Sequence, residues 1–183
     1  WHQVLHMGAE PDSIVEARIE VPFRGWTISG QIDHYRAGVI SDWKTASAWA
    51  VILGVKPEWE QQLNLYAWLM RHRGHKVEQL QIVAFLKDLN EVKKSMKTSR
   101  SPRPLPPSSV LVIPQAMWDP KRTESFLVGR LEAHEEALQG NLPLCTEEET
   151  WKGRRCAEYC SVNQFCEQFR GKLERFVRYK EPM

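Results

Sequence analysis

Asp33, Asp42 and Lys44 have the residue types and the spacing of a catalytic metal centre. Asp33 precedes Asp42 by nine positions, and one residue separates Asp42 from Lys44. Side chains alternate along a strand, so Asp42 and Lys44 should project to one face about 7 Å apart. Two carboxylates, water molecules and a backbone carbonyl, which we assign to Trp43, would form a hard-oxygen site suited to Mg²⁺ or Mn²⁺.

A lysine beside such a cation has a defined chemical use. Lys44 can orient or help to deprotonate an attacking water, or it can stabilise charge that grows on a phosphate. The cation supplies Lewis acidity and lowers the pKa of the water. A simpler interpretation of Asp-x-Lys is an ion pair on a solvated strand, which contributes little to stability. The tripeptide alone does not separate the two interpretations.

Gln62 and Tyr66 are a second pair of candidate site residues. Their separation of four positions places them on one face of a helix. There they can bond to the active-site lysine or to a DNA phosphate. The alternative is that Tyr66 belongs to the core and Gln62 only borders it.

Cysteine is confined to one end of the chain. All four cysteines lie within 22 residues, as Cys145, Cys156, Cys160 and Cys166. With no secretory signal, a shared metal is favoured over two disulfides packed into so short a stretch. Four thiolates suit either Zn²⁺ or a [4Fe–4S] cluster. Unpaired thiols and disulfides remain the alternatives.

A basic run lies in the middle of the chain. It is either a solvated loop or a surface that contacts the phosphates of DNA. Its candidate DNA-binding residues are Lys93, Lys94, Lys97, Arg100 and Arg103.

The elements that must position the candidate site are short strands followed by a helix. Residues 16–24 and 26–33 read as a hairpin around Arg24-Gly25. A third strand over residues 38–45 follows a polar turn containing Arg36 and Ala37. Apolar residues at spacings of three and four predict a helix over residues 58–72.

The remaining pattern completes an α/β fold. A strand over residues 79–86 after the helix indicates a crossover in a mixed central β-sheet flanked by helices. Residues 99–109 predict an exposed loop, residues 110–114 a strand and residues 123–139 a helix. We expect one domain overall, with a core over residues 1–141 and a cysteine-rich metal-binding tail over residues 142–183 packed on it.

Composition limits the class of protein. A chain of 183 residues fits one sizeable core, and its 42% hydrophobic content is ordinary for a soluble protein. No apolar run approaches the roughly 18–20 residues that span a bilayer, so no membrane partner is expected. No secretory pattern is visible, which favours a cytoplasmic location. The net charge of +2 does not argue for nucleic acid by itself, and the start at Trp1 suggests missing preceding residues.

Three ordered motifs together resemble a known family. Gly30-Gln-Ile-Asp33, Ile40-Ser-Asp42-Trp-Lys44-Thr45 and Gln62-Leu-Asn-Leu-Tyr66 look like the RecB-type branch of the PD-(D/E)XK nucleases, and phage-encoded exonucleases look closest. The resemblance extends from about His2 to Cys166. It implies a restriction-endonuclease-like core in which Asp33 and Asp42 hold the metal and Lys44 is the catalytic lysine.

The same resemblance assigns further residues. Gln62 and Tyr66 match the Gln-x-x-x-Tyr motif that supports the site and the DNA. Members of the branch carry a metal-binding histidine in a His-x-x-Leu setting, which favours His2 over His6 here. Glu16 is a further possible ligand. For the cysteine tail, the resemblance favours [4Fe–4S] over Zn²⁺, although the interval of three residues between Cys156 and Cys160 departs from the family's usual two.

These observations predict a Mg²⁺- or Mn²⁺-dependent deoxyribonuclease. The first hypothesis is a 5′ or 3′ exonuclease that works with phage recombination, replication or repair proteins. The alternatives are a structure-specific or restriction-like endonuclease, a catalytically silent DNA-binding module, and a metal-stapled protein-interaction domain.

Overall fold

The computed structural model describes residues 13–101, 103–142 and 144–170. By compactness the chain divides into two units, Trp1–Leu127 and Val128–Met183. The first unit contains the sheet and the candidate catalytic residues, and the second contains the cysteines. In the part of the chain that the structure describes, no helix is both long enough and apolar enough to cross a membrane.

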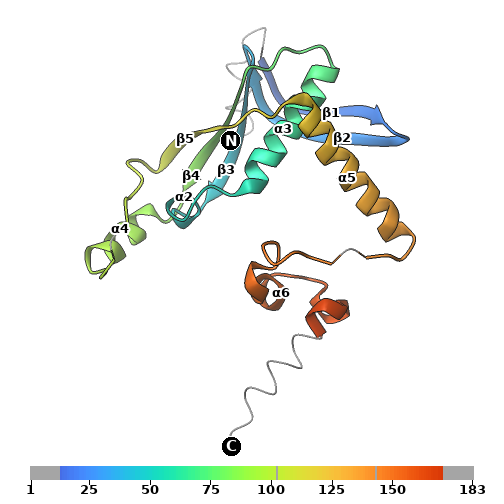
Figure 1. Cartoon of the computed structure of the whole chain (residues 1–183). Helices are drawn as coiled ribbons and strands as arrows, with labels where there is room; N and C mark the ends of the chain where they lie inside the picture. The colour runs from blue at the N-terminus through green and yellow to red at the C-terminus, as the bar shows by residue number, and fades with distance from the viewer. Residues whose placement is uncertain (1–12, 102, 143, 171–183) are drawn as a thin grey trace, which may run out of the picture. The chain divides into compact units, whose positions relative to one another are not determined.

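A five-stranded mixed sheet forms the first unit (Figure 1). The strands follow one another in space in chain order, and only β3 and β4 are parallel. This confirms the predicted mixed sheet. The strands are β1 (Ser13–Phe23), β2 (Trp26–Arg36), β3 (Val39–Ala46), β4 (Gln79–Leu86) and β5 (Val110–Gln115).

Two-residue turns connect the first three strands. Arg24 and Gly25 have φ values of 51° and 80°, and Ala37 and Gly38 have values of 47° and 84°. Two successive positive φ values are those of a type I′ turn, whose twist matches that of a hairpin. The first hairpin confirms the prediction. At the second turn, Arg36 closes β2 instead of lying in the loop, and Ala37 and Gly38 alone connect the strands.

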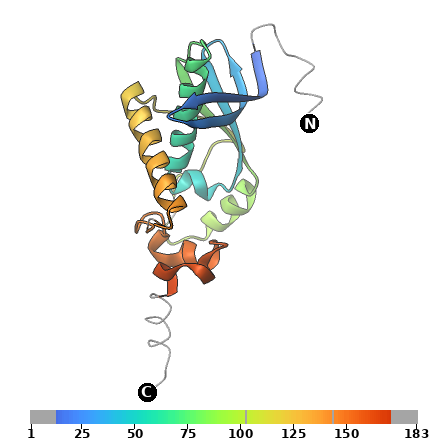
Figure 2. The ribbon, with the colours of Figure 1, turned by 90° about the vertical axis from the view of Figure 1, so that its right-hand side faces the viewer.

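The helix α3 (Pro57–His72) crosses between the parallel strands β3 and β4 and packs on the sheet (Figures 1 and 2). Proline at its first position and acidic residues in its first turn favour helix initiation there. Its buried stripe includes Leu63 and Met70, which are fully buried together with Ile32, Ile40 and Ile82 of the sheet. The predicted helix and crossover are therefore present.

Two short helices of the first unit, and the short helices of the cysteine segment described below, were not predicted. A single turn, α2 (Trp49–Ile52), follows β3, and α4 (Leu89–Lys97) follows β4. The basic run is expected to be either a solvated loop or a phosphate-contacting surface, and its first part is helical. Leu89, Val92 and Met96 of α4 pack on the core at helical spacing, but charged residues outnumber them in this short segment.

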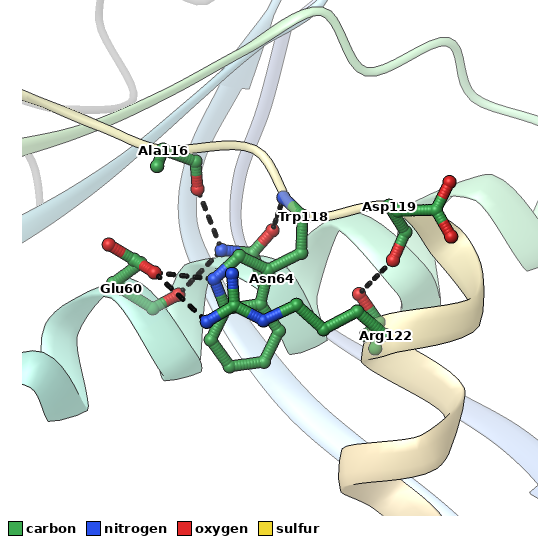
Figure 3. A network of polar contacts seen from close by, with 7 residues as sticks. Glu60, Asn64, Ala116, Trp118, Asp119 and Arg122 are labelled. Atoms are coloured by element: carbon green, nitrogen blue, oxygen red, sulfur yellow. Dashed lines mark hydrogen bonds and ion pairs between the residues drawn. The ribbon is translucent and has the colours of Figure 1, made fainter.

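The segment that connects β5 to the helix α5 (Pro120–Leu138) contacts Glu60 and Asn64 of α3 (Figure 3). Asn64 donates hydrogen bonds of 2.9 Å to the carbonyls of Glu60 and Ala116 and accepts one of 2.7 Å from the backbone N–H of Trp118. The indole of Trp118 donates to the Glu60 carboxylate, and the Arg122 guanidinium lies 4.1 Å from the Trp118 ring centroid. Asn64 is buried, and these contacts satisfy its amide group.

The second unit contains the end of α5 and short helices in the cysteine segment. These are η1 (Trp151–Gly153), α6 (Arg154–Glu158) and η2 (Asn163–Phe165). Several large apolar side chains are exposed here, among them Trp151, Tyr159 and Phe165. Polar contacts therefore contribute much of its local order, including two hydrogen bonds between Gln168 and the backbone of Cys145.

Candidate active site

Asp33 lies where β2 and β3 stop pairing. The antiparallel register ends at His34↔Ser41 and, if continued, would set Ile32 opposite Trp43. Instead, the backbone N–H of Trp43 donates a hydrogen bond of 2.8 Å to Oδ2 of Asp33. The carboxylate thus satisfies an amide that the separated strands leave unpaired. This contact fixes Asp33 beside the segment that carries Asp42 and Lys44.

Asp42 is almost completely buried, with 1% of its surface exposed. The Lys44 ammonium nitrogen lies 2.7 Å from its Oδ2 and forms an ion pair with it, while that oxygen has no further hydrogen-bond partner among the described residues. Burial raises the pKa of Asp42, and the nearby Asp33 adds to the rise, while Lys44 opposes it. A buried carboxylate with an unsatisfied oxygen is suited to a cation.

Lys44 is held from a second side by the helix. Its ammonium donates a hydrogen bond of 2.8 Å to the side-chain oxygen of Gln62, and the Gln62 amide donates one of 2.5 Å to the Tyr66 hydroxyl. The structure therefore brings Asp42, Lys44, Gln62 and Tyr66 into one continuous chain of contacts. Of the two expected roles of Gln62, the bond to the lysine is present.

Tyr66 faces the same acidic centre. Burial raises the pKa of its phenol, the bond from Gln62 lowers it, and the carboxylates of Asp42 and Asp33 raise it further. The hydroxyl therefore stays protonated across the neutral range. Because it accepts the Gln62 bond, it keeps its own proton to donate elsewhere.

A polar contact just beyond β3 was not predicted from the sequence. Asp88, at the end of β4, accepts hydrogen bonds of 2.6 Å from the Ser47 hydroxyl and from the Ala48 backbone N–H. The Ser47 bond and then the Ala48 bond lower the pKa of Asp88. The contact ties the end of β3, three residues after Lys44, to the start of α4. About forty positions separate the partners, so no local pattern indicates it.

The expected metal ligands are only partly present among the described residues. Asp33 and Asp42 lie together, and Glu16 lies in β1 between the residues paired with Ile32 and His34, which places it opposite Asp33. His2 and His6 lie outside the described residues. Over residues 13–101, 103–142 and 144–170, no three histidine, cysteine, aspartate or glutamate side chains form a group that could hold a metal ion.

This absence includes the predicted cysteine cluster. Burial raises the pKa of the Cys145 thiol, and the charges of Glu149, Cys156 and Cys166 add to this rise. Cys145 thus lies near Cys156 and Cys166, and all four cysteines are free. However, they do not form a metal-ligating group in the described part of the chain, so the predicted [4Fe–4S] or Zn²⁺ site is not supported by the geometry.

The basic residues proposed for DNA contact lie on α4 and in the segment after it. Lys94, Lys97, Arg100 and Arg103 are exposed, and Lys93 is half-buried. These side chains are therefore accessible to a charged partner. The structure provides no contact between them and the carboxylate centre.

Among the comparisons with known proteins, a family model supports the nuclease superfamily and not a particular branch of it. A crystal structure of SSO0001 is similar, with a TM-score of 0.48 and 15% sequence identity over 85% of this chain and 60% of that chain. This chain therefore spans less than two thirds of that protein. No curated protein matches the sequence. The family model of the PD-(D/E)XK nuclease superfamily matches residues 1–167, which is most of the chain. The chain belongs to the PD-(D/E)XK nuclease superfamily.

Proposed function

We propose that this protein is a Mg²⁺- or Mn²⁺-dependent deoxyribonuclease that hydrolyses phosphodiester bonds through Asp33, Asp42 and Lys44. The main support for the proposal is the contact chain Asp42–Lys44–Gln62–Tyr66. It places a buried carboxylate, a lysine ammonium group and two neutral polar side chains next to one another. Within this activity, we favour an exonuclease of the RecB-like branch that acts in phage-type recombination, replication or repair.

The donor chemistry at this centre fits a hard divalent cation. Asp33 and Asp42 supply carboxylate oxygens, and among the described residues the buried Oδ2 of Asp42 has only its ion pair with Lys44. These two residues would hold the ion, with the Trp43 carbonyl and His2 as further proposed ligands. When bound, the ion supplies Lewis acidity and lowers the pKa of a water.

Lys44 is positioned to act on that water or on the phosphate. Its ammonium has three N–H donors, one directed to Gln62 and one drawn to Asp42, so one remains available. Lys44 is about one-quarter exposed, so this donor can reach a substrate. We assign it to orienting the attacking water or to stabilising charge that develops on the scissile phosphate.

Tyr66 adds a neutral donor to the same centre. Its hydroxyl accepts from Gln62 and stays protonated because its pKa is raised. We assign the free proton to a hydrogen bond with a non-bridging phosphate oxygen. The exposed basic residues of α4 and the following segment supply sequence-independent contacts with the DNA backbone.

The test is a cleavage assay on linear, circular and single-stranded DNA in Mg²⁺, Mn²⁺ or EDTA. Asp42→Ala and Lys44→Ala are compared with wild type after circular dichroism shows that each is folded. We expect linear DNA to be degraded only with metal, circles to be spared, and both variants to be inactive. Cleavage of circles would support the endonuclease alternative. Binding without any cleavage would support a silent DNA-binding module and contradict the proposed enzyme.

The cysteine tail needs a separate measurement, and we retain [4Fe–4S], with Zn²⁺ as the alternative, as its proposed occupant. Anaerobically purified protein is analysed for iron, sulfide and zinc and by visible absorption. The expected result is near-stoichiometric iron and sulfide, with loss of both in Cys160→Ala. Zinc in their place would select the alternative, and absence of all three would remove the metal from the proposal.

A further inference from the structure

Gly30 lies against the ring of Tyr66. A Cβ atom added to Gly30 would be 2.8 Å from Cε1 and 3.1 Å from Cδ1 of Tyr66, and 2.9 Å from Cδ1 of Leu69. Gly30 is not among the glycines with positive φ, so its backbone does not demand glycine. Glycine is therefore required at position 30 for steric reasons. Tyr66 and Leu69 of α3 occupy the space that a side chain at this position would need.

The two neighbours differ in how they can respond to an added methyl group. Leu69 is 1% exposed and lies in the core, where little room exists for another rotamer. Tyr66 is only partly buried and lies at the edge of the site. Its ring is planar and rigid, so a push on Cε1 displaces the adjacent hydroxyl as well. The expected response to a side chain at position 30 is a shift of Tyr66.

That hydroxyl ends the contact chain of the catalytic centre. It accepts the 2.5 Å bond from Gln62, whose oxygen receives the 2.8 Å bond from Lys44. A displaced Tyr66 ring would therefore break the first bond and release the amide that orients the lysine. Gly30 also lies three residues before Asp33 on β2. The same strand therefore contains the proposed metal-binding aspartate and the glycine that contacts the Tyr66 ring.

We propose that Gly30 is a positioning residue whose missing side chain seats the Tyr66 ring and thereby sets the geometry of the Lys44–Gln62–Tyr66 chain. This inference rests on the proposed nuclease function. Gly30 touches neither substrate nor metal in this account. Its effect on cleavage passes through Tyr66, which gives the proposal a signature in a double-mutant cycle.

The experiment compares Gly30→Ala with Gly129→Ala in steady-state cleavage of linear DNA. Gly129 lies in α5 with nothing within 4 Å of an added Cβ, so it receives the same methyl group in open space. We expect Gly30→Ala to lower kcat on the order of 100-fold, as for a misplaced catalytic group, with the KM for DNA nearly unchanged. Gly129→Ala should behave as wild type. Full kcat in Gly30→Ala would overturn the proposal.

The cycle uses Tyr66→Ala, which removes the ring that the methyl group would meet. In the Tyr66→Ala background, Gly30→Ala should cause no further loss of kcat. An equal loss in both backgrounds would show that Gly30 does not act through Tyr66. Leu69→Ala in the Gly30→Ala protein tests the other neighbour: recovery of kcat there would assign the effect to Leu69 and reject the proposal.

A thermal unfolding cycle separates this inference from the proposed function. Gly30→Ala should lower Tm by more in the wild-type background than in the Tyr66→Ala background, where only the contact with Leu69 remains, whether or not the protein cleaves DNA. If Gly30→Ala fails to fold, Gly30→Ala/Tyr66→Ala should fold, and failure of that double variant would overturn the proposal. The wild-type protein could be inactive while the effects of Gly30→Ala and Tyr66→Ala on Tm are not additive. That result would reject the nuclease function and keep the inference that Gly30 positions the Tyr66 ring.

Discussion

Gln62 accepts a hydrogen bond of 2.8 Å from the Lys44 ammonium and donates one of 2.5 Å to the Tyr66 hydroxyl. These two bonds fix which end of the amide is oxygen, because the reverse orientation would set two donors against each other at Lys44. The lysine is thus held by a neutral acceptor as well as by the Asp42 carboxylate. Its position depends on a helix as much as on its own strand.

Replacing Gln62 should therefore affect turnover more than binding. Gln62→Ala is expected to lower kcat on the order of 100-fold, because Lys44 and Tyr66 each lose their orienting partner. The measurement is steady-state cleavage, which should show a nearly constant KM for DNA. Gln61→Ala is the matched control, since it removes the same side chain one position away on α3. Equal kcat in the two variants would contradict the prediction.

Asp42 should destabilise the metal-free protein as the pH rises. Its pKa in the folded state is raised by burial, so the folded state binds more protons than the unfolded state between the ordinary aspartate pKa of about 3.9 and the raised value. Stability therefore falls across that interval, by about 1.4 kcal/mol for each unit of pKa difference. Asp42→Asn should remove the fall and be more stable than wild type at pH 7.

Urea unfolding in EDTA between pH 4 and pH 8 checks this prediction. The free-energy difference between Asp42→Asn and wild type should grow with pH and then level off. Added Mg²⁺ should reverse the order by stabilising wild type alone. A difference that does not vary with pH in EDTA would show that Asp42 has no raised pKa.

Asn64 should be among the positions most sensitive to substitution outside the catalytic centre. Asn64→Ala would leave the Ala116 carbonyl and the Trp118 N–H without their partners. Leaving buried polar groups unpaired costs about 1–3 kcal/mol each, so we expect a loss of roughly 2–6 kcal/mol. Chemical denaturation measures it. Asn141→Ala, at an exposed position, is the control. An equally small loss in the free energy of unfolding in both variants would contradict the role of the Asn64 hydrogen bonds.

Asp88 should stabilise the end of β3 in a pH-dependent manner. Its lowered pKa means that its contribution is present above the ordinary aspartate pKa and is lost as the pH falls through the lowered value. Because the group is partly exposed, we expect Asp88→Asn to cost only about 1 kcal/mol at pH 7 and less in acid. A double-mutant cycle with Ser47→Ala measures the coupling, and strictly additive losses would show that the two side chains act independently.

The first half of the fold is predictable because its signals are local. Arg24-Gly25 marks a type I′ turn, and the spacing of Trp59, Leu63 and Met70 marks a helix that must cross between parallel strands. The helix α4 was not predicted although Leu89, Val92 and Met96 follow helical spacing, because it is short and its charges favoured a solvated loop or a phosphate-contacting surface. A short element in a highly charged segment is easily overlooked even where its apolar residues are periodic.

The proximity of Asp33, Asp42 and Lys44 was predictable from the sequence, and their connections to the helix were not. Asp33, Asp42 and Lys44 are recognisable from residue type and spacing, and the structure places them together. The bond from Lys44 to Gln62 and the contact of Gly30 with Tyr66 join residues 18 and 36 positions apart, so they depend on how the helix docks. The cysteine spacing suggested a metal site, but spacing alone does not bring thiols into coordination geometry.

The crossover through α3 has a consequence for the nascent chain. A polypeptide that has emerged from the ribosome only as far as β3 already carries Asp33, Asp42 and Lys44, yet it lacks the residues that orient the lysine. The parallel partner β4 emerges still later, and pairing it requires closure of a long loop. Assembly of the centre is thus delayed until most of the sheet exists. If the proposed nuclease function holds, the chain can gain activity only after α3 and β4 have been synthesised.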